Sequence, residues 1–174
     1  MPSVDGEVKA QKRVIDWLVD DLHYIYLGTL EDEDNTPIKE DLLYKNLKKR
    51  GYSDTLIKPA ISKLIRAASN QVKSLYDLNK DVYELLRYGV DAKDDDNSRP
   101  NVHFIDWDNV ENNDFYVAEE VTVLRTDGDT RKRPDLVLYV NGIALGMFEL
   151  KRSSVEVGEG IRQLLQNQRS ENIK

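Results

Sequence analysis

Apolar side chains recur at helical spacing in four parts of the N-terminal half of the chain. The first of these parts, residues 7–22, predicts an amphipathic helix. The same spacing predicts further helices at residues 38–50, 53–68 and 74–88. Gly51 supplies a helix stop and Ser74 a helix N-cap. The outward positions of the three later helices carry no motif, so this run is interpreted as scaffold, an insertion or a small helical subdomain.

The pattern changes after an acidic stretch at residues 91–98, which Pro100 closes. Beyond it, apolar runs predict strands at residues 102–107, 115–125, 135–140 and 143–150, and a last helix at residues 157–171. The two strands at 135–140 and 143–150 are apolar on both faces, so both faces are expected to be covered. Together these elements predict an α/β sandwich with a central mixed sheet flanked by helices, interrupted by the helical insertion.

Composition narrows the class of protein. The chain has 174 residues, 40% apolar and 33% charged, which fits one domain or a core with a small subdomain. It contains no cysteine and only two histidines, which excludes disulfides and zinc–thiolate sites and argues against a histidine-rich metal site. No apolar run approaches the roughly 20 residues of a membrane helix, and the N-terminus has no signal pattern. A cytoplasmic protein is expected.

The formal net charge is −7, which argues against a general nucleic-acid coat, because phosphate neutralisation supplies most non-specific affinity. The charge is unevenly distributed. Basic residues crowd the hairpin predicted after residue 130, and four of them are candidates for DNA contact: Arg131, Lys132, Arg133 and Arg152.

Three charged residues flank the two most apolar strands. Asp135 stands at the head of the first strand, and Glu149 and Lys151 stand at the tail of the second. Mg²⁺ takes oxygen ligands and needs only one or two carboxylates when water and a substrate phosphate complete its shell. Asp135, Glu149 and the backbone carbonyl of Leu150 could supply those oxygens. Lys151 could orient or help to deprotonate an attacking water, or stabilise the charge on the phosphate oxygens. The pattern therefore indicates a Mg²⁺-dependent phosphodiesterase.

Strand register sets a condition on this site. A simple two-residue Asn-Gly turn pairs Val140 with Ile143, which puts Asp135 and Glu149 on opposite faces of the hairpin. A shared metal therefore requires a loop of odd length or a β-bulge, for which Gly142 and Gly146 are the obvious places.

Other interpretations of these charges stay open at this point. A single Asp and a Glu-x-Lys at a strand end can be ordinary solvated charges. Glu7 continues the apolar stripe of the first predicted helix. It is either a first-turn residue that favours the helix dipole or a carboxylate directed into a site.

The stretch R-P-D-L-V-L-Y-V-N-G-I-A-L-G-M-F-E-L-K-R at residues 133–152 resembles the PD-(D/E)xK nuclease motif. Specifically, it resembles the N-terminal nuclease domain of the R (restriction) subunit of type I restriction enzymes. The resemblance covers residues 114–170 well and the first helix more loosely. It implies a restriction-endonuclease-like fold, with Asp135 and Glu149 as metal ligands and Lys151 as the catalytic lysine.

The same resemblance extends to two auxiliary positions. Glu7 matches the acidic residue that many such nucleases carry on their first helix. Gln163 matches the glutamine of a Gln-x-x-x-Tyr motif on the helix after the lysine, although Asn167 stands where the family has tyrosine.

At the level of the whole protein, the resemblance implies residues 1–30 as the first helix of a nuclease core, 31–98 as the insertion and 99–174 as the catalytic core of a larger subunit. It also implies Mg²⁺ as cofactor, with Mn²⁺ as a substitute, and double-stranded DNA and the modification and specificity subunits as partners. ATP is expected to bind only in the full-length protein, because this chain has no G-x-x-x-x-G-K-[ST].

Two alternatives to this nuclease subunit remain. One is a non-catalytic interaction module that retains the fold, and the other is a stand-alone PD-(D/E)xK repair nuclease.

Overall fold

The computed structural model describes residues 5–31, 36–70, 72–95, 98–124, 131–150, 161–162 and 165, with only the backbone for 5–7, 123–124 and 131–132. The chain divides into two compact units. Unit 1 comprises residues 1–36, 115–139 and 144–174, and unit 2 comprises residues 37–114 and 140–143.

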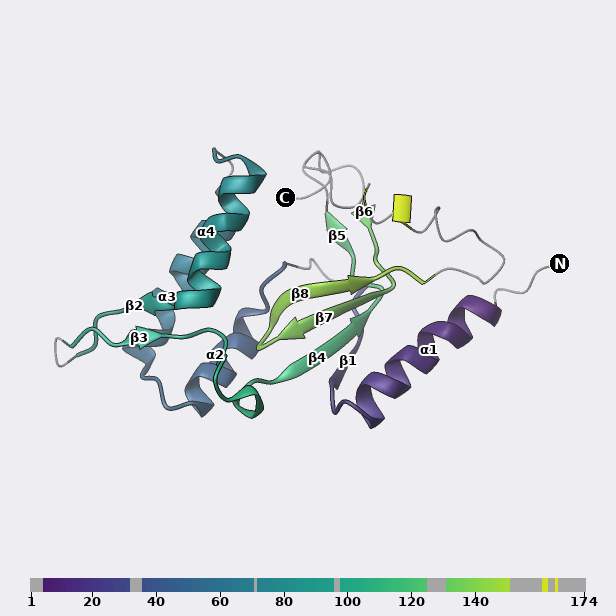
Figure 1. Cartoon of the computed structure of the whole chain (residues 1–174), viewed down its shortest axis with the longest axis horizontal. Coiled ribbons are helices and arrows are strands. Elements are labelled where there is room, and N and C mark those ends of the chain that lie inside the picture. Colours follow the sequence, from purple (N-terminus) through teal and green to yellow (C-terminus); the bar gives the residue numbers. More distant parts are fainter. Residues whose placement is uncertain are drawn as a thin grey trace. The chain divides into compact units, whose positions relative to one another are not determined.

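Unit 1 is built on a four-stranded mixed sheet in the order β1-β4-β7-β8 (Figure 1). The strands are β1 (Ile25–Thr29), β4 (Phe115–Glu119), β7 (Leu136–Val140) and β8 (Ile143–Phe148). The strands β1 and β4 run parallel, and β7 and β8 form the predicted hairpin. A short antiparallel pair, β5 (Val123–Leu124) with β6 (Arg131–Lys132), also belongs to this unit. The expectation of a mixed α/β architecture is therefore confirmed.

Helix α1 (Asp5–Asp20) confirms the first predicted helix and covers one face of this sheet. Leu18 on the apolar stripe of α1 packs against Val117 of β4 and Leu136 of β7. Leu18 is only 2% exposed as a result, and the other two residues are fully buried. Leu138 and Leu150 pack against the same cluster. Helix α1 therefore covers the face of the sheet that carries Val117, Leu136 and Leu138.

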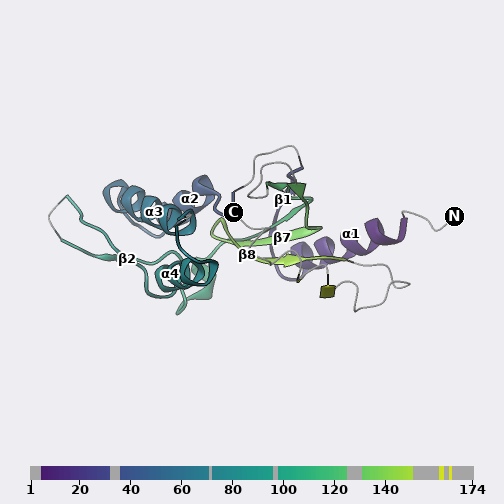
Figure 2. The same cartoon turned by 90° about the horizontal axis from the view of Figure 1, so that it is seen from above.

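Unit 2 contains the three other predicted helices, all confirmed: α2 (Glu40–Lys49), α3 (Asp54–Ala68) and α4 (Leu75–Tyr88) (Figure 2). The Ser74 cap is confirmed as well, since its hydroxyl accepts the backbone N–H of Asp77 at 3.1 Å. Gly51 follows α2 with a φ of +91°, as a helix-ending glycine requires. The helices enclose an apolar core with a short antiparallel pair, β2 (Val90–Asp91) and β3 (Asn101–Val102).

The turn of the β7–β8 hairpin, residues 140–143, belongs to unit 2. Asn141 and Gly142 have φ values of +53° and +86°, which is the type I′ geometry that Asn-Gly favours. A Cβ on Gly142 would lie 2.6 Å from the carbonyl oxygen of Lys39. Glycine is therefore required here twice, by the backbone conformation and by the close approach of the start of α2.

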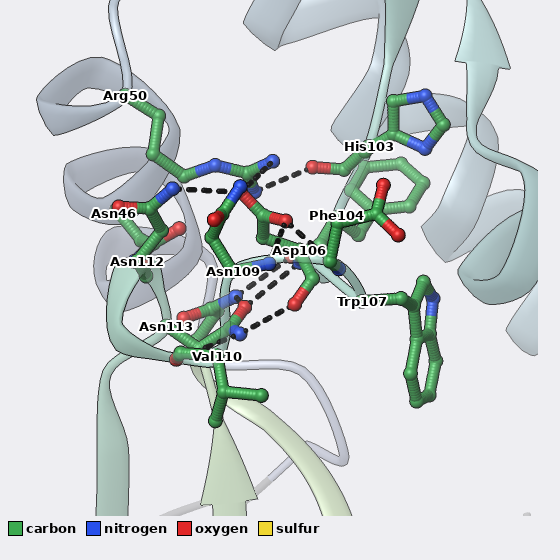
Figure 3. A network of polar contacts seen from close by, with 12 residues as sticks. Asn46, Arg50, His103, Phe104, Asp106, Trp107, Asn109, Val110, Asn112 and Asn113 are labelled. Carbon is green, nitrogen blue, oxygen red and sulfur yellow. Dashed lines mark hydrogen bonds and ion pairs between the residues drawn. The ribbon is translucent and has the colours of Figure 1, made fainter.

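Two strand predictions were too long. The strand predicted at 102–107 ends at Val102, because Asp106 draws the following chain into a turn by accepting the backbone N–H groups of Asp108 and Asn109 (Figure 3). The strand predicted at 115–125 breaks at Glu120, whose φ of +53° is incompatible with an extended chain.

The expectation that β8 is covered on both faces was wrong for the described residues. β8 is an edge strand, and Leu145 and Met147 are 49% and 43% exposed. The helix predicted at 157–171 lies almost wholly outside the described residues. Within the part of the chain that is described, no helix is long and apolar enough to cross a membrane.

Candidate active site

Asp135 lies at the entrance of β7, where several elements of unit 1 fix it. Its carboxylate accepts a hydrogen bond from the backbone N–H of Leu150, just past the end of β8. Its carbonyl oxygen accepts the backbone N–H of Glu120 at 3.1 Å and the side-chain amide of Gln11 at 3.4 Å. The head of β7, the tail of β8, the end of β4 and helix α1 therefore meet at this residue.

The hairpin loop has two residues, which removes the odd-length loop and leaves the bulge as the predicted alternative. The pairing beyond the turn is nevertheless shifted. A Cβ on Gly146 would lie 3.7 Å from the Cβ of Leu138, which requires these two residues to share a face. Regular pairing from a two-residue turn would put Leu138 opposite Leu145 instead. One extra residue in β8, a bulge, accounts for the difference.

The bulge determines where the two carboxylates point. Leu138 and Leu150 both pack on the α1 side of the sheet, in agreement with the shared face of Leu138 and Gly146. Asp135 and Glu149 lie one residue outside β7 and β8, and we infer from continued alternation of side chains that both share the other face. A bulge of this kind is what a shared site requires, and Asp135 and Glu149 are both partly buried residues.

A pocket of about 580 Å³ opens on the α1 side of this site, between α1, β1 and the end of β4. Glu119 is its central polar group. One carboxylate oxygen of Glu119 accepts from the hydroxyls of Tyr26 and Thr29, and the other accepts from the amide of Gln11 at 3.0 Å. Gln11 thus links Glu119 to the backbone of Asp135, so the pocket wall and the candidate site form one hydrogen-bonded group.

Burial raises the pKa of the Tyr26 hydroxyl to about 12, and its hydrogen bond to the Glu119 carboxylate adds to the shift. In the unfolded chain the tyrosine pKa is about 10. The folded state therefore holds this proton more tightly, and its stability should fall as the pH rises from about 10 to about 12. Absorbance titration of the folded chain should show one tyrosine ionising near pH 12 that disappears in Tyr26→Phe. An unchanged titration curve in that variant would contradict the assignment.

Arg133 is the one predicted DNA contact whose side chain is described. It pairs with Glu31 and, at 3.0 Å, with Glu120. Both carboxylates line the pocket beside the candidate site. The guanidinium therefore lies beside the pocket and compensates acidic charge there. Its contact with DNA remains a prediction.

The other predicted site residues are only partly covered by the structure. Glu7 lies in α1 and Arg131 and Lys132 in β6, with their side chains outside the described set. Lys151, Arg152, Gln163 and Asn167 also lie outside the described residues.

Gln11 and Glu119 were not predicted as site residues. The sequence offered a signal only for Glu119, an acidic residue that interrupts an apolar strand. Gln11 looked like an ordinary surface residue of an amphipathic helix. It lies four residues, about one helical turn, after Glu7 in α1.

Carboxylate and carbonyl oxygens are the donors available around Asp135, and this donor set fits Mg²⁺ or Mn²⁺. Among the described side chains, no three His, Asp or Glu residues lie close enough together to enclose a metal ion on their own. The arrangement therefore fits an ion held by two carboxylates and completed by water and a substrate phosphate.

Comparison with known proteins gives an independent result. Residues 7–174 match the family described as "Type I restriction enzyme R protein N terminus". The match includes both α1 and the β7–β8 hairpin, and it extends across the helical part at 38–88, where the sequence offered no motif.

Two similar proteins are named as endonuclease subunits of type I restriction enzymes. The chain is 39% identical over 74 residues to the putative type I restriction enzyme MjaIXP endonuclease subunit of Methanocaldococcus jannaschii, which covers 40% of this chain and 7% of the relative. It is 30% identical over 81 residues to the type I restriction enzyme SsaAORF53P endonuclease subunit of Staphylococcus saprophyticus, covering 47% of this chain and 8% of the relative. The matched segments are thus less than a tenth of the relatives' length.

Proposed function

Because this chain belongs to the type I restriction enzyme R protein N-terminus family, we propose that it is the endonuclease domain of a type I restriction–modification system, cleaving double-stranded DNA. The observation that carries the proposal is the hydrogen bond from the backbone N–H of Leu150 to the Asp135 carboxylate, which brings Asp135 next to the segment that follows β8 and contains Glu149. The mixed sheet with α1 on one face supports a restriction-endonuclease-like sandwich.

In this proposal Asp135 and Glu149 hold a Mg²⁺ ion, with the carbonyl of Leu150 as a third oxygen. In an extended chain the N–H and C=O of one residue point to the same side, so the hydrogen bond from Leu150 to Asp135 is compatible with that carbonyl facing the site. When bound, the ion supplies charge stabilisation on the phosphate and lowers the pKa of a water. Glu7 and Gln163 are proposed as auxiliary groups.

The protein's own groups contribute position and proton transfer. The N–H of Leu150 fixes the Asp135 carboxylate, and Gln11 and Glu120 fix its backbone, so the site is organised before DNA binds. Lys151 is proposed to orient the attacking water and to stabilise the negative oxygens of the phosphate. Arg131, Lys132, Arg133 and Arg152 are proposed to contact the DNA backbone.

We further propose that this chain is a small part of a longer protein, with an ATP-driven motor outside residues 1–174, and that this protein assembles with modification and specificity subunits. Sequence recognition is assigned to those partners, because nothing in the sequence of this chain resembles a base-reading module.

The metal-binding part of the proposal can be tested without DNA. Titration of the chain with Mn²⁺ should show a site that is at least about 10-fold weaker in Glu149→Ala, because even loss of an outer-sphere partner commonly has that effect. Glu111→Ala, which removes an exposed carboxylate from unit 2, is the matched control and should bind as the parent does.

An alternative function is a non-catalytic interaction module with a nuclease-like fold. It is favoured by the net charge of −7 and by Asn167, which stands where the family has tyrosine. Mn²⁺ binding that is the same in Glu149→Ala and in the parent chain would support this alternative and refute the catalytic site.

A further inference from the structure

Helix α4 of unit 2 carries an exposed row of alternating aromatic and cationic side chains. Tyr76, Lys80, Tyr83 and Arg87 follow one another at intervals of four, three and four residues, which places them on one face of the helix. Tyr76 is 77% exposed and Tyr83 is 60% exposed. The row is about 16 Å long, from the rise of an α-helix.

Trp107 extends this row beyond the helix. Its indole N–H donates to the carbonyl of Leu86 at 3.0 Å, which anchors the ring beside the C-terminal end of α4. The guanidinium carbon of Arg87 lies 5.5 Å from the centre of the indole ring, and the tryptophan remains 49% exposed. Figure 3 shows the indole projecting away from the polar network around Asp106. Trp107 and the four α4 residues form what we call the α4 row.

The charges of the row are not neutralised within unit 2. In the described part of the chain, neither Lys80 nor Arg87 forms an ion pair with a carboxylate. The acidic residues of α4 lie on the adjacent arc of the helix. Two of them are engaged locally, because Asp77 bonds to Ser74 and Asp81 pairs with Lys73. The two cations are therefore available to an external anion.

Unit 2 as a whole is compatible with a polyanionic ligand. It contains 13 Lys and Arg and 14 Asp and Glu, a net charge of −1, whereas the whole chain has a net charge of −7. Most of the negative net charge that argues against nucleic-acid binding thus lies in unit 1, which contains the predicted metal site.

We propose that the α4 row is a binding site for single-stranded nucleic acid. Exposed aromatic rings spaced along a surface offer platforms for unstacked bases, and cations between them meet the phosphates. A duplex keeps its bases stacked and would leave the tyrosines unused. Two cations are also few for a duplex, whose affinity comes mainly from phosphate neutralisation. No residue of the proposed nuclease site takes part, so this inference does not depend on the catalytic proposal.

The expected binding is weak and only slightly salt-dependent. Each phosphate neutralised on a single strand changes the slope of log K against log salt by about −0.7, so two cations give about −1.4. Lys80→Gln should reduce that slope by about half. Removal of one stacking ring should weaken binding by about fivefold or more.

Fluorescence anisotropy of a labelled oligothymidine of about 20 nucleotides, with the 174-residue chain and EDTA present to prevent cleavage, provides the test. Tyr83→Ala should weaken binding at least about fivefold, while Tyr83→Phe, which keeps the ring, should bind like the parent. Tyr88→Ala is the matched control, since Tyr88 is 64% exposed on the same helix but outside the row. A circular dichroism spectrum and melting temperature for each variant establish that it is folded.

Three results would overturn the proposal. One is no binding of the oligonucleotide at millimolar protein, and another is an equal loss in Tyr83→Ala and Tyr88→Ala. The third is unchanged oligonucleotide binding in Tyr83→Ala together with failure of that variant to assemble with the other restriction subunits, which would identify the row as a protein interface. Asp135→Ala should bind the oligonucleotide as the parent does, because Asp135 lies outside the α4 row. Oligonucleotide binding therefore tests the α4 row, and metal binding and DNA cleavage test the nuclease proposal.

Discussion

Replacing Asp135 by alanine in the complete restriction complex is expected to reduce DNA cleavage by about 10³-fold or more. The substitution removes a proposed metal ligand, and loss of even one electrostatic group that stabilises developing charge commonly costs about 10²- to 10³-fold. Lys151→Ala should have an effect of similar size through loss of its ammonium group. Cleavage of a plasmid with one recognition site, followed by gel electrophoresis, measures the effect.

Translocation provides the internal control for both variants, because ATP-driven movement is assigned to another part of the protein. ATP hydrolysis should remain at the parent rate. Asp135→Asn separates charge from structure, since its amide oxygen can still accept the N–H of Leu150, and it should be folded but inactive. Asp91→Ala removes an exposed carboxylate in unit 2 and should leave cleavage unchanged. Normal cutting by Asp135→Ala or Lys151→Ala would refute the assignment.

Asn141→Ala is expected to destabilise unit 2 by about 3 kcal/mol or more. The fully buried side chain donates to the carbonyl of Phe104 and the amide oxygen of Asn113, each at 2.8 Å, and accepts the backbone N–H of Asp114 at 2.7 Å. Removing the amide leaves three buried polar groups without that partner, at about 1–3 kcal/mol for each group that stays unsatisfied. Urea unfolding followed by circular dichroism measures the change.

Two further variants separate the causes of that loss. Asn141→Gly removes the same hydrogen bonds but tolerates the positive φ, so it should be less destabilised than Asn141→Ala by about 1 kcal/mol. Asn79→Ala changes an exposed asparagine of α4 and should stay within about 0.5 kcal/mol of the parent. If Asn141→Ala unfolds within 1 kcal/mol of the parent, the network does not have the stabilising role assigned to it.

The helices were predictable because their signals are local. Apolar spacing, the Ser74 cap and the Gly51 stop all lie within or beside the helix that they define. β1 was missed because its five residues gain their place only by pairing with β4, about 90 positions later in the chain. The break at Glu120 was equally hidden, since a glutamate with positive φ has no characteristic sequence pattern.

The sequence predicted which residues would have to share a face of the hairpin, but it did not predict the strand pairing that would bring them there. The apolar hairpin and its flanking charges singled out Asp135 and Glu149 as candidates, and counting residues showed that a shared face needs an odd-length loop or a bulge. The sequence did not by itself distinguish a bulge from a longer loop. Asn-Gly favours a two-residue turn, which the chain adopts, but nothing in the sequence marks where an extra residue would enter β8. The role of Gln11 depends on where α1 packs, so no local pattern predicts it.

The type I′ turn at Asn141-Gly142 also bears on how the helical part can be removed. Residues 140–143 count with unit 2, and Ile143 contributes to its apolar core. A variant lacking residues 37–114 would retain this turn while losing Phe104, Asn113 and Asp114, the partners of the Asn141 side chain. Deletion of the helical part should therefore succeed only when the hairpin tip is redesigned as well. Transfer of the helical part to another protein should require both of its segments, residues 37–114 and 140–143.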